Sequence, residues 1–264
     1  RVFPSGRIED PRAQLSNVNL PEAAVIRLGR PNNAGVMPQV RITDWDYTDE
    51  WGWASLILSQ MGEGTANINF ATTKIDPNNQ EAIQLAIKSF VCPSASLPNG
   101  RPAPAAGSNI GGYGYLTYRG NTGTSPEPNE TSTTNGVFFK NSAVSFKNMR
   151  DGEAYTIGIG ESMMGYWGDA NSGMARMADD DGDNNPDWGS DGVSPSSAPS
   201  TFDTYLLAPG SQSLHLFGFG SWHTDSVNFA LCDGSTRSFP KTIDFKVISA
   251  MCTRDGGERV NVPE

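Results

Sequence analysis

An aspartate-rich segment is the first feature of the sequence that could bind a ligand. The run Asp179-Asp180-Asp181-Gly182-Asp183 is followed closely by Asp187. Carboxylates at alternate positions around a glycine can point inward from one tight loop, which suits a hard divalent cation, and calcium better than magnesium. We therefore predict a calcium site formed by Asp179, Asp181, Asp183 and Asp187. The alternative is an acidic loop that is solvated without a bound ion.

The spacing of these acids resembles the calcium loops of thrombospondin type 3 and dockerin-like repeats. It departs from the EF-hand loop, because Asn184 stands where that loop has a glycine and no glutamate occupies the twelfth position. Acids packed this closely repel one another unless a cation or solvent neutralises them. This repulsion favours the calcium interpretation.

A second set of candidate residues consists of Glu161, His223 and Asp233, the last followed by Gly234. Nine residues separate His223 from Asp233. Two carboxylates and an imidazole could form a structural hydrogen-bond network, a metal site or an acid–base set. Ser162 and Ser221 do not lie in a G-x-S-x-G motif, so no nucleophile is apparent. We favour the structural network, and a hydrolase that uses Glu161 and His223 is the third hypothesis for function.

Aromatic residues near the acidic run offer another type of binding. These residues are Tyr166, Trp167, Trp188 and Trp222. Exposed rings beside a calcium loop could stack on sugars, which makes an extracellular carbohydrate- or solute-binding module the second hypothesis. The alternative is ordinary packing in the core, which is the more common role of tryptophan.

The composition limits the classes of protein that are possible. The chain has 264 residues, 37% of them apolar, with Gly 29 and Pro 18, and its net charge is −10. This charge argues against binding nucleic acid or anionic lipid, both of which require clustered basic residues. No stretch has the length and hydropathy of a membrane span, and no CxxC pair suggests a zinc or redox motif. Because the sequence begins at Arg1 without a methionine, we expect a processed form that has lost a targeting segment.

Short periodic segments predict an α+β fold with an antiparallel sheet, short helices and long loops. Alternation of Val227, Phe229 and Leu231 before Asp233-Gly234 predicts a β-hairpin. Further strands are expected at 24–28, 111–119, 137–139, 144–147 and 155–160. Helices are expected at 49–58, 79–91 and 242–252. Apart from strand 24–28, residues 1–45 look irregular.

We predict one globular domain over residues 1–264 with an inserted lobe at 165–200. That segment is rich in glycine, aspartate, serine and proline, so it lacks the apolar residues of an ordinary core. Acids recur throughout 151–203, where Arg176 is the one basic residue. We expect this lobe to lie on the surface.

Several segments together resemble a bacterial prepilin-like family of unknown function that carries an H-X9-DG signature and was formerly labelled solute-binding. The segments are Phe3-Pro4, Trp51-Gly52-Trp53, Cys92-Pro93-Ser94, Asn135-Gly136-Val137-Phe138, Gly160-Glu161-Ser162, His223 with Asp233-Gly234, and Gly256-Gly257-Glu258. Ala95 departs from the family pattern, which has aspartate there. The resemblance extends from residue 3 to residue 258.

This resemblance implies a pilin-like or pseudopilin-like head that is located in the cell envelope or outside the cell and is not an enzyme. Its expected work is filament or surface assembly, with itself or with other pilin-like envelope subunits as partners. Members begin with a prepilin peptidase site and a hydrophobic helix, which this sequence lacks, and membrane contact would occur only through that helix. The helix usually carries a cysteine that could pair with the residue matching Cys92. In its absence, Cys232 and Cys252 are a possible disulfide.

Overall fold

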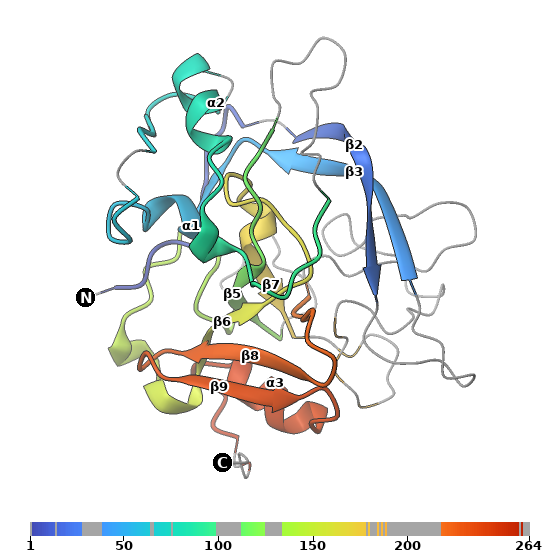
Figure 1. The fold of residues 1–264 in the computed structure, drawn as a ribbon. Helices are drawn as coiled ribbons and strands as arrows, with labels where there is room; N and C mark the ends of the chain where they lie inside the picture. Colours follow the sequence, from blue (N-terminus) through green and yellow to red (C-terminus); the bar gives the residue numbers. More distant parts are fainter. Residues whose placement is uncertain are drawn as a thin grey trace.

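The computed structural model describes most of the chain and has a mixed α+β fold (Figure 1). The described residues are 2–13, 15–27, 39–63, 66–74, 76–98, 112–124, 134–177, 179, 184, 186, 188, 218–258 and 260. No helix within these ranges has the length and hydropathy needed to cross a membrane. The α+β class and the long loops agree with the prediction from sequence.

A five-stranded mixed sheet forms the centre, with the strand order β7-β5-β6-β8-β9. Its strands are β5 (Tyr118–Gly123), β6 (Ile157–Glu161), β7 (Met174–Arg176), β8 (Ser226–Leu231) and β9 (Thr236–Pro240). Strand β5 pairs antiparallel with β6 and parallel with β7, while β8 pairs antiparallel with β6 and β9. The parallel pair β5–β7 departs from the antiparallel sheet that was predicted.

The β8–β9 hairpin confirms the strongest local prediction. Val227, Phe229 and Leu231 are buried on one face of β8, as their alternation indicates. Gly234 has a φ of +89°, a conformation that residues with a side chain rarely adopt, so the glycine makes the tight turn possible. The Asp233 side chain accepts hydrogen bonds from the amide and hydroxyl of Ser235, which completes the turn.

A long antiparallel ribbon, β2 (Leu15–Arg27) with β3 (Gln39–Thr48), extends along one side of the molecule (Figure 1). The prediction of an irregular segment here is wrong. Pro21 interrupts the apolar alternation, and the pairing register shifts between Asn19 and Ala24, where proline cannot donate a ladder hydrogen bond. The polar residues and the proline within these strands break the apolar alternation from which a strand is predicted, so the ribbon was not predicted.

Helices are shorter than the sequence predicts. Among the described residues, the α-helices are α1 (Trp53–Leu56), α2 (Pro77–Ile83) and α3 (Phe245–Cys252). Single turns of 3-10 helix occur at η1 (Lys88–Phe90), η2 (Phe146–Asn148), η3 (Glu153–Tyr155) and η4 (Asn171–Gly173). Residues Trp51–Gly52 form β4 and pair with β1 (Arg7–Ile8), so the first helix starts only after them. Asp244 caps α3, because its side chain accepts a hydrogen bond from the Lys246 amide.

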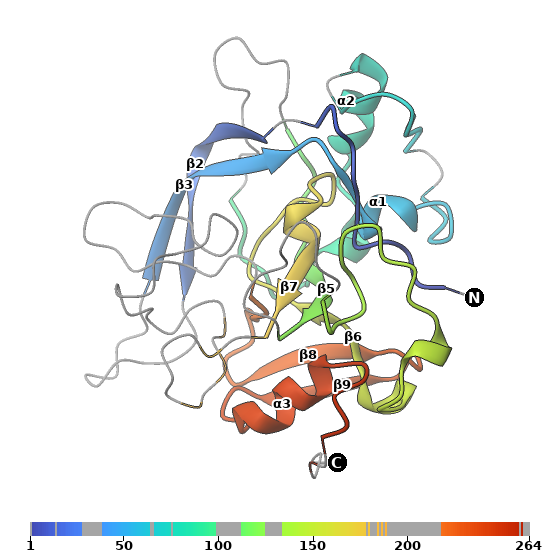
Figure 2. The same cartoon turned by 180° about the vertical axis from the view of Figure 1, so that it is seen from behind.

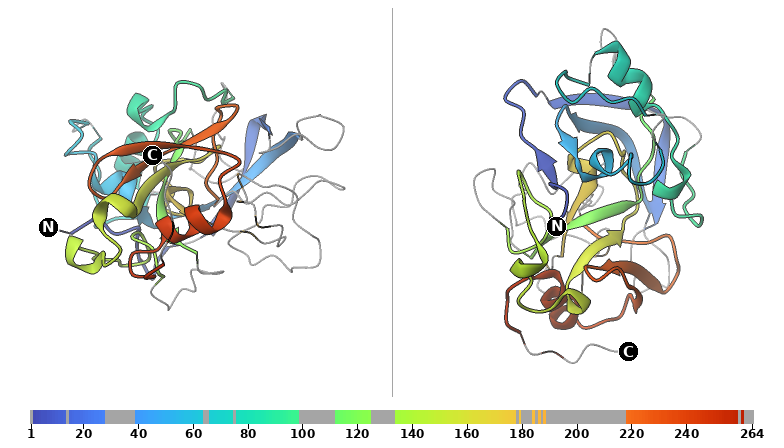
Figure 3. Two further views of the ribbon diagram at one scale, coloured as in Figure 1. Left: turned by 90° about the horizontal axis from the view of Figure 1, so that it is seen from below. Right: turned by 90° about the vertical axis from the view of Figure 1, so that its left-hand side faces the viewer.

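Two clusters of buried side chains make up the core of the described part of the chain. One contains residues of β3, α1 and α2 together with the segments that flank β5 and β6. The other lies between the β8–β9 hairpin and α3, and includes Phe229, Ile248 and Met251. Figure 2 shows α3 against one face of the hairpin, and Figure 3 shows the same arrangement from two further sides.

The predicted surface lobe at 165–200 is wrong for its first part. Residues 165–177 are buried and include η4 and β7, which joins the central sheet. Trp167 and Ala170 have no exposed surface. Glycines and small polar residues, read from sequence as loop signals, instead let the chain pass close to other core segments. Most of 178–200 lies outside the described residues.

Candidate functional site

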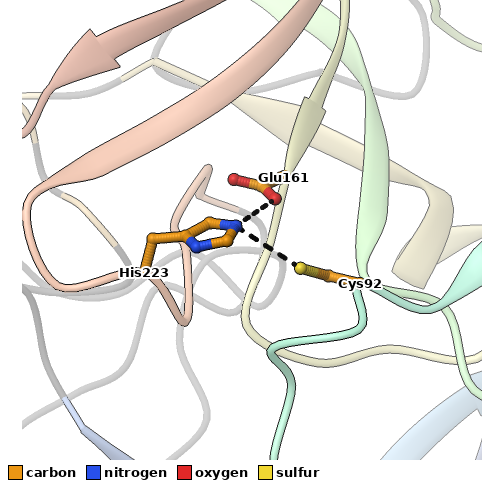
Figure 4. A group of neighbouring side chains, drawn as sticks. All are labelled: Cys92, Glu161 and His223. Carbon is orange, nitrogen blue, oxygen red and sulfur yellow. Dashed lines mark hydrogen bonds and ion pairs between the residues drawn. The ribbon is translucent and has the colours of Figure 1, made fainter.

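Three side chains from distant parts of the sequence meet beside the central sheet: Cys92, Glu161 and His223 (Figure 4). Nε2 of His223 lies 3.2 Å from Oε1 of Glu161 and 3.6 Å from Sγ of Cys92. Cys92 and Glu161 are buried, whereas the His223 side chain is 35% exposed. The cluster is therefore open to solvent on its histidine side.

Glu161, the last residue of β6, is held by its second carboxylate oxygen. Oε2 accepts hydrogen bonds from the Ser221 hydroxyl at 2.8 Å and from the backbone amide of Asn228 at 2.9 Å. The same Ser221 hydroxyl accepts from the His223 amide at 3.1 Å. The carboxylate thus connects β6 to β8 and to the segment that precedes β8.

The segment 218–225 carries His223. Hydrogen bonds connect it to β6 and to the residues that follow β6 and β9. The Gly220 amide donates to the Glu161 carbonyl, and the indole of Trp222 donates to the Met163 carbonyl at 2.7 Å. The Lys241 ammonium donates to the Ser221 carbonyl at 3.1 Å. Burial lowers the pKa of Lys241, while Asp225 and Glu161 partly oppose that shift.

Cys92 follows η1 and reaches the cluster from the opposite side. Its amide donates to the Thr117 hydroxyl at 2.7 Å. Burial is the main cause that raises the pKa of Cys92, and the nearby Glu161 carboxylate raises it further. The free thiol is therefore protonated at neutral pH and is a poor nucleophile.

The structure brings together two of the three residues predicted as a network and separates the third. Glu161 and His223 are in contact. Asp233 lies in the hairpin turn, at the opposite end of β8 from His223, where its partner is Ser235. Hydrogen bonds from Ser235 lower the pKa of Asp233. Asp233 and Gly234 of the H-X9-DG pattern thus serve the turn, and Asp233 is not part of the cluster.

Cys92 was not predicted from the sequence as a partner of Glu161 and His223. The signal was present, because Cys92-Pro93-Ser94 is one of the segments that resemble the prepilin-like family. Its proximity to His223 depends on how the chain after η1 crosses the sheet, which no local pattern reveals.

Of the four predicted calcium ligands, the structure describes Asp179. Asp181, Asp183 and Asp187 lie outside the described residues. Oδ2 of Asp179 accepts from the Asn184 amide at 3.1 Å, and Asn184 has a φ of +63°. Oδ1 of Asp179 is buried and has no hydrogen-bond partner within the described part of the chain.

The three cysteines are free thiols, so the disulfide considered between Cys232 and Cys252 is not formed in this structure. Cys232 packs in the cluster around β3 and α1, whereas Cys252 packs between α3 and the hairpin. Burial raises the pKa of Cys232 to about 12 and also raises the pKa of Cys252. Their side chains point into separate parts of the core, which explains the difference from the expectation.

The aromatic residues considered for sugar stacking are used inside the protein. Tyr166, Trp167 and Trp188 are buried, and Trp222 is partly buried. The indole of Trp167 donates to the Leu85 carbonyl and that of Trp188 to the Lys241 carbonyl. Core packing, the alternative stated above, describes these rings better than a binding platform.

The geometry of the cluster does not suit a catalytic triad. In a triad, one imidazole nitrogen takes the proton of the nucleophile while a carboxylate orients the ring through the other nitrogen. Here Cys92 and Glu161 both approach Nε2 of His223 (Figure 4). Sulfur, nitrogen and oxygen atoms that converge on one point can instead share hydrogen bonds or bind a cation.

The fold and this cluster define a mixed α+β protein with a central five-stranded sheet and a Cys-Glu-His cluster. A family model described as "Protein of unknown function (DUF1559)" matches residues 1–246, so the chain belongs to that family. No curated protein matches the chain. No solved structure matches it either.

Proposed function

We propose that this protein is a pilin-like, non-enzymatic structural subunit of the cell envelope or the cell exterior that works in filament or surface assembly. The observation that supports a structural role best is the complete engagement of Glu161. One carboxylate oxygen faces His223, and the other holds Ser221 and Asn228. A carboxylate that contacts the His223 imidazole, the Ser221 hydroxyl and the Asn228 backbone amide stabilises the sheet. It is poorly placed for proton transfer to a substrate.

The N-terminal segment supports a head that is carried on a preceding helix. The N-terminus lies at the edge of the molecule (Figure 1). Val2 is 65% exposed, and Phe3 packs against Phe138 and Phe146. A helix joined before Val2 would leave the head without crossing its core. The resemblance to prepilin-like sequences, including H-X9-DG, points to the same arrangement.

The native gene product provides the test of this role. We expect it to fractionate with the cell envelope and to cross-link to itself or to other pilin-like subunits. The isolated head of residues 1–264 serves as the control and should give little cross-linking, because the proposed helix carries the assembly contacts. A native product recovered as a cytoplasmic monomer would contradict the proposal.

Calcium is the cofactor proposed for the acidic run. The buried, unpartnered Oδ1 of Asp179 within the described residues supports it, because a hard cation would satisfy that oxygen. At a calcium concentration about 100 times the Kd, the free energy of unfolding should rise by about 2.7 kcal/mol. Calorimetric titration and denaturant unfolding would measure both quantities.

Matched variants make the calcium test specific. Asp181→Asn should weaken calcium binding at least about tenfold, because it removes one charged ligand. Asp244→Asn should leave binding unchanged, because Asp244 caps α3. Equal stabilisation by magnesium, or no heat of calcium binding, would exclude the site.

A further inference from the structure

We propose that Cys92, Glu161 and His223 bind a divalent transition-metal ion of the zinc class, with a fourth coordination position open to solvent beside His223. This site is distinct from the calcium loop and independent of the assembly role. The three ligand atoms, Sγ, Oε1 and Nε2, all lie within 4.8 Å of one another.

Distances within the cluster fit a tetrahedral ion. With bonds of about 2.3 Å to sulfur and about 2.0–2.1 Å to nitrogen and oxygen, tetrahedral ligands lie about 3.6 Å apart for sulfur and nitrogen and about 3.4 Å apart for nitrogen and oxygen. The corresponding separations in the protein are 3.6 Å and 3.2 Å. Two of the three ligand separations therefore match a tetrahedral ion, and the third, between Sγ and Oε1, is no more than 4.8 Å.

Hydrogen bonds can link these three side chains in two ways. A neutral imidazole carries a hydrogen on one nitrogen only, so Nε2 of His223 either donates or accepts. If it donates to Glu161, the Cys92 thiol can donate to the same carboxylate; if it accepts from the thiol, it faces the carboxylate without a hydrogen. A cation at the centre suits the sulfur, nitrogen and oxygen lone pairs together.

The surroundings already orient the proposed ligands. The Ser221 hydroxyl and the Asn228 backbone amide fix Oε2 of Glu161, so that Oε1, the oxygen facing His223, is positioned to act as a single ligand. The Thr117 hydroxyl accepts from the Cys92 amide, and the Ser221 hydroxyl accepts from the His223 amide. Such outer contacts are typical of metal sites, where they set ligand direction.

The donor set identifies the class of metal. A thiolate and an imidazole favour zinc and similar borderline ions, whereas calcium and magnesium prefer oxygen ligands alone. Binding replaces the S–H bond of Cys92 with a sulfur–metal bond and releases that proton to solvent, so no oxidant or reductant is needed. Three protein ligands and one open position leave room for water or for a donor from a partner.

Metal binding to the purified, chelator-treated chain tests this site. We expect one zinc per chain after removal of excess metal, and a thiolate-to-metal charge-transfer band when cobalt(II) replaces zinc. Cys92→Ser should abolish the band, and His223→Gln should weaken zinc binding more than tenfold. Excess calcium should not displace the zinc, which separates this result from the calcium proposal.

Matched controls use the remaining residues of the same types. His215→Gln changes the other histidine, and Cys232→Ser changes another cysteine; both should keep the stoichiometry and the cobalt band. Circular dichroism would establish whether each variant is folded. We expect His223→Gln to fold, because the His223 side chain is partly exposed. Absence of binding in the wild type, or an unchanged band in folded Cys92→Ser, would overturn the proposal.

Discussion

Replacing Asp169 with alanine is expected to lower the free energy of unfolding by about 4 kcal/mol. The Asp169 carboxylate is buried and accepts hydrogen bonds from several donors on two segments. They are the Trp45 indole, the backbone amides of Thr48, Asn171 and Ser172, and the hydroxyl of Ser172. Truncation would leave these donors unsatisfied in the core, where water cannot easily replace the carboxylate.

Two further variants isolate the cause. Asp169→Asn keeps the volume but places an amide NH2 against donors, so it should still cost about 2 kcal/mol. Asp244→Asn is the matched control and should change stability by less than about 0.5 kcal/mol, because asparagine also caps helices well. Urea unfolding at one pH would measure all three. A loss below about 1 kcal/mol for Asp169→Ala would show that this network contributes little in solution.

Local sequence patterns were enough to predict the elements that are stabilised mainly by contacts between residues close together in the sequence. The β8–β9 hairpin follows from the alternation of apolar residues and from Asp233-Gly234, and the helix expected at 242–252 is present as α3. The β2–β3 ribbon was not predictable in this way, because it depends on cross-strand pairing that occurs on both sides of the register shift between Asn19 and Ala24.

The candidate site was predictable in part. Glu161 and His223 were identified because both lie in segments that resemble one family, and the structure places them in contact. Asp233 was grouped with them by spacing along the sequence, yet a strand runs straight, so residues at its two ends lie apart. Cys92 joins the cluster through a long-range crossing that the sequence pattern does not contain.

Buried charge was the feature least visible from sequence. Lys74 and Asp169 appear in the sequence as ordinary polar residues of loop segments, but both are buried. The Lys74 ammonium donates to the carbonyls of Thr48 and Glu50 and lies 5.1 Å from the centre of the Trp51 ring. Residues of this type are buried only when the fold supplies partners, and those partners come from β3 and the turn that follows it.

Lys74 should make the stability of the protein increase with pH above neutrality. Burial lowers the pKa of Lys74 from 10.5 to about 8, although the nearby carboxylates of Asp169, Asp49 and Glu50 oppose the shift. Between these two pKa values, the unfolded chain holds a proton on Lys74 that the folded protein has released. Unfolding therefore takes up a proton, and the free energy of unfolding rises with pH in this interval.

Comparison with Lys74→Met isolates this effect, since methionine is similar in length and does not titrate. From about pH 7 to about pH 9.5, the wild type should gain about 2 kcal/mol in free energy of unfolding relative to the variant. Burial raises the pKa values of Tyr47 and Tyr113, but both tyrosines occur in both proteins and cancel in the difference. Urea unfolding of the two proteins at both pH values gives the measurement. Parallel pH profiles would mean that Lys74 keeps its proton in the folded state, held by the surrounding carboxylates, and that desolvation is the weaker of the two opposing forces at this position.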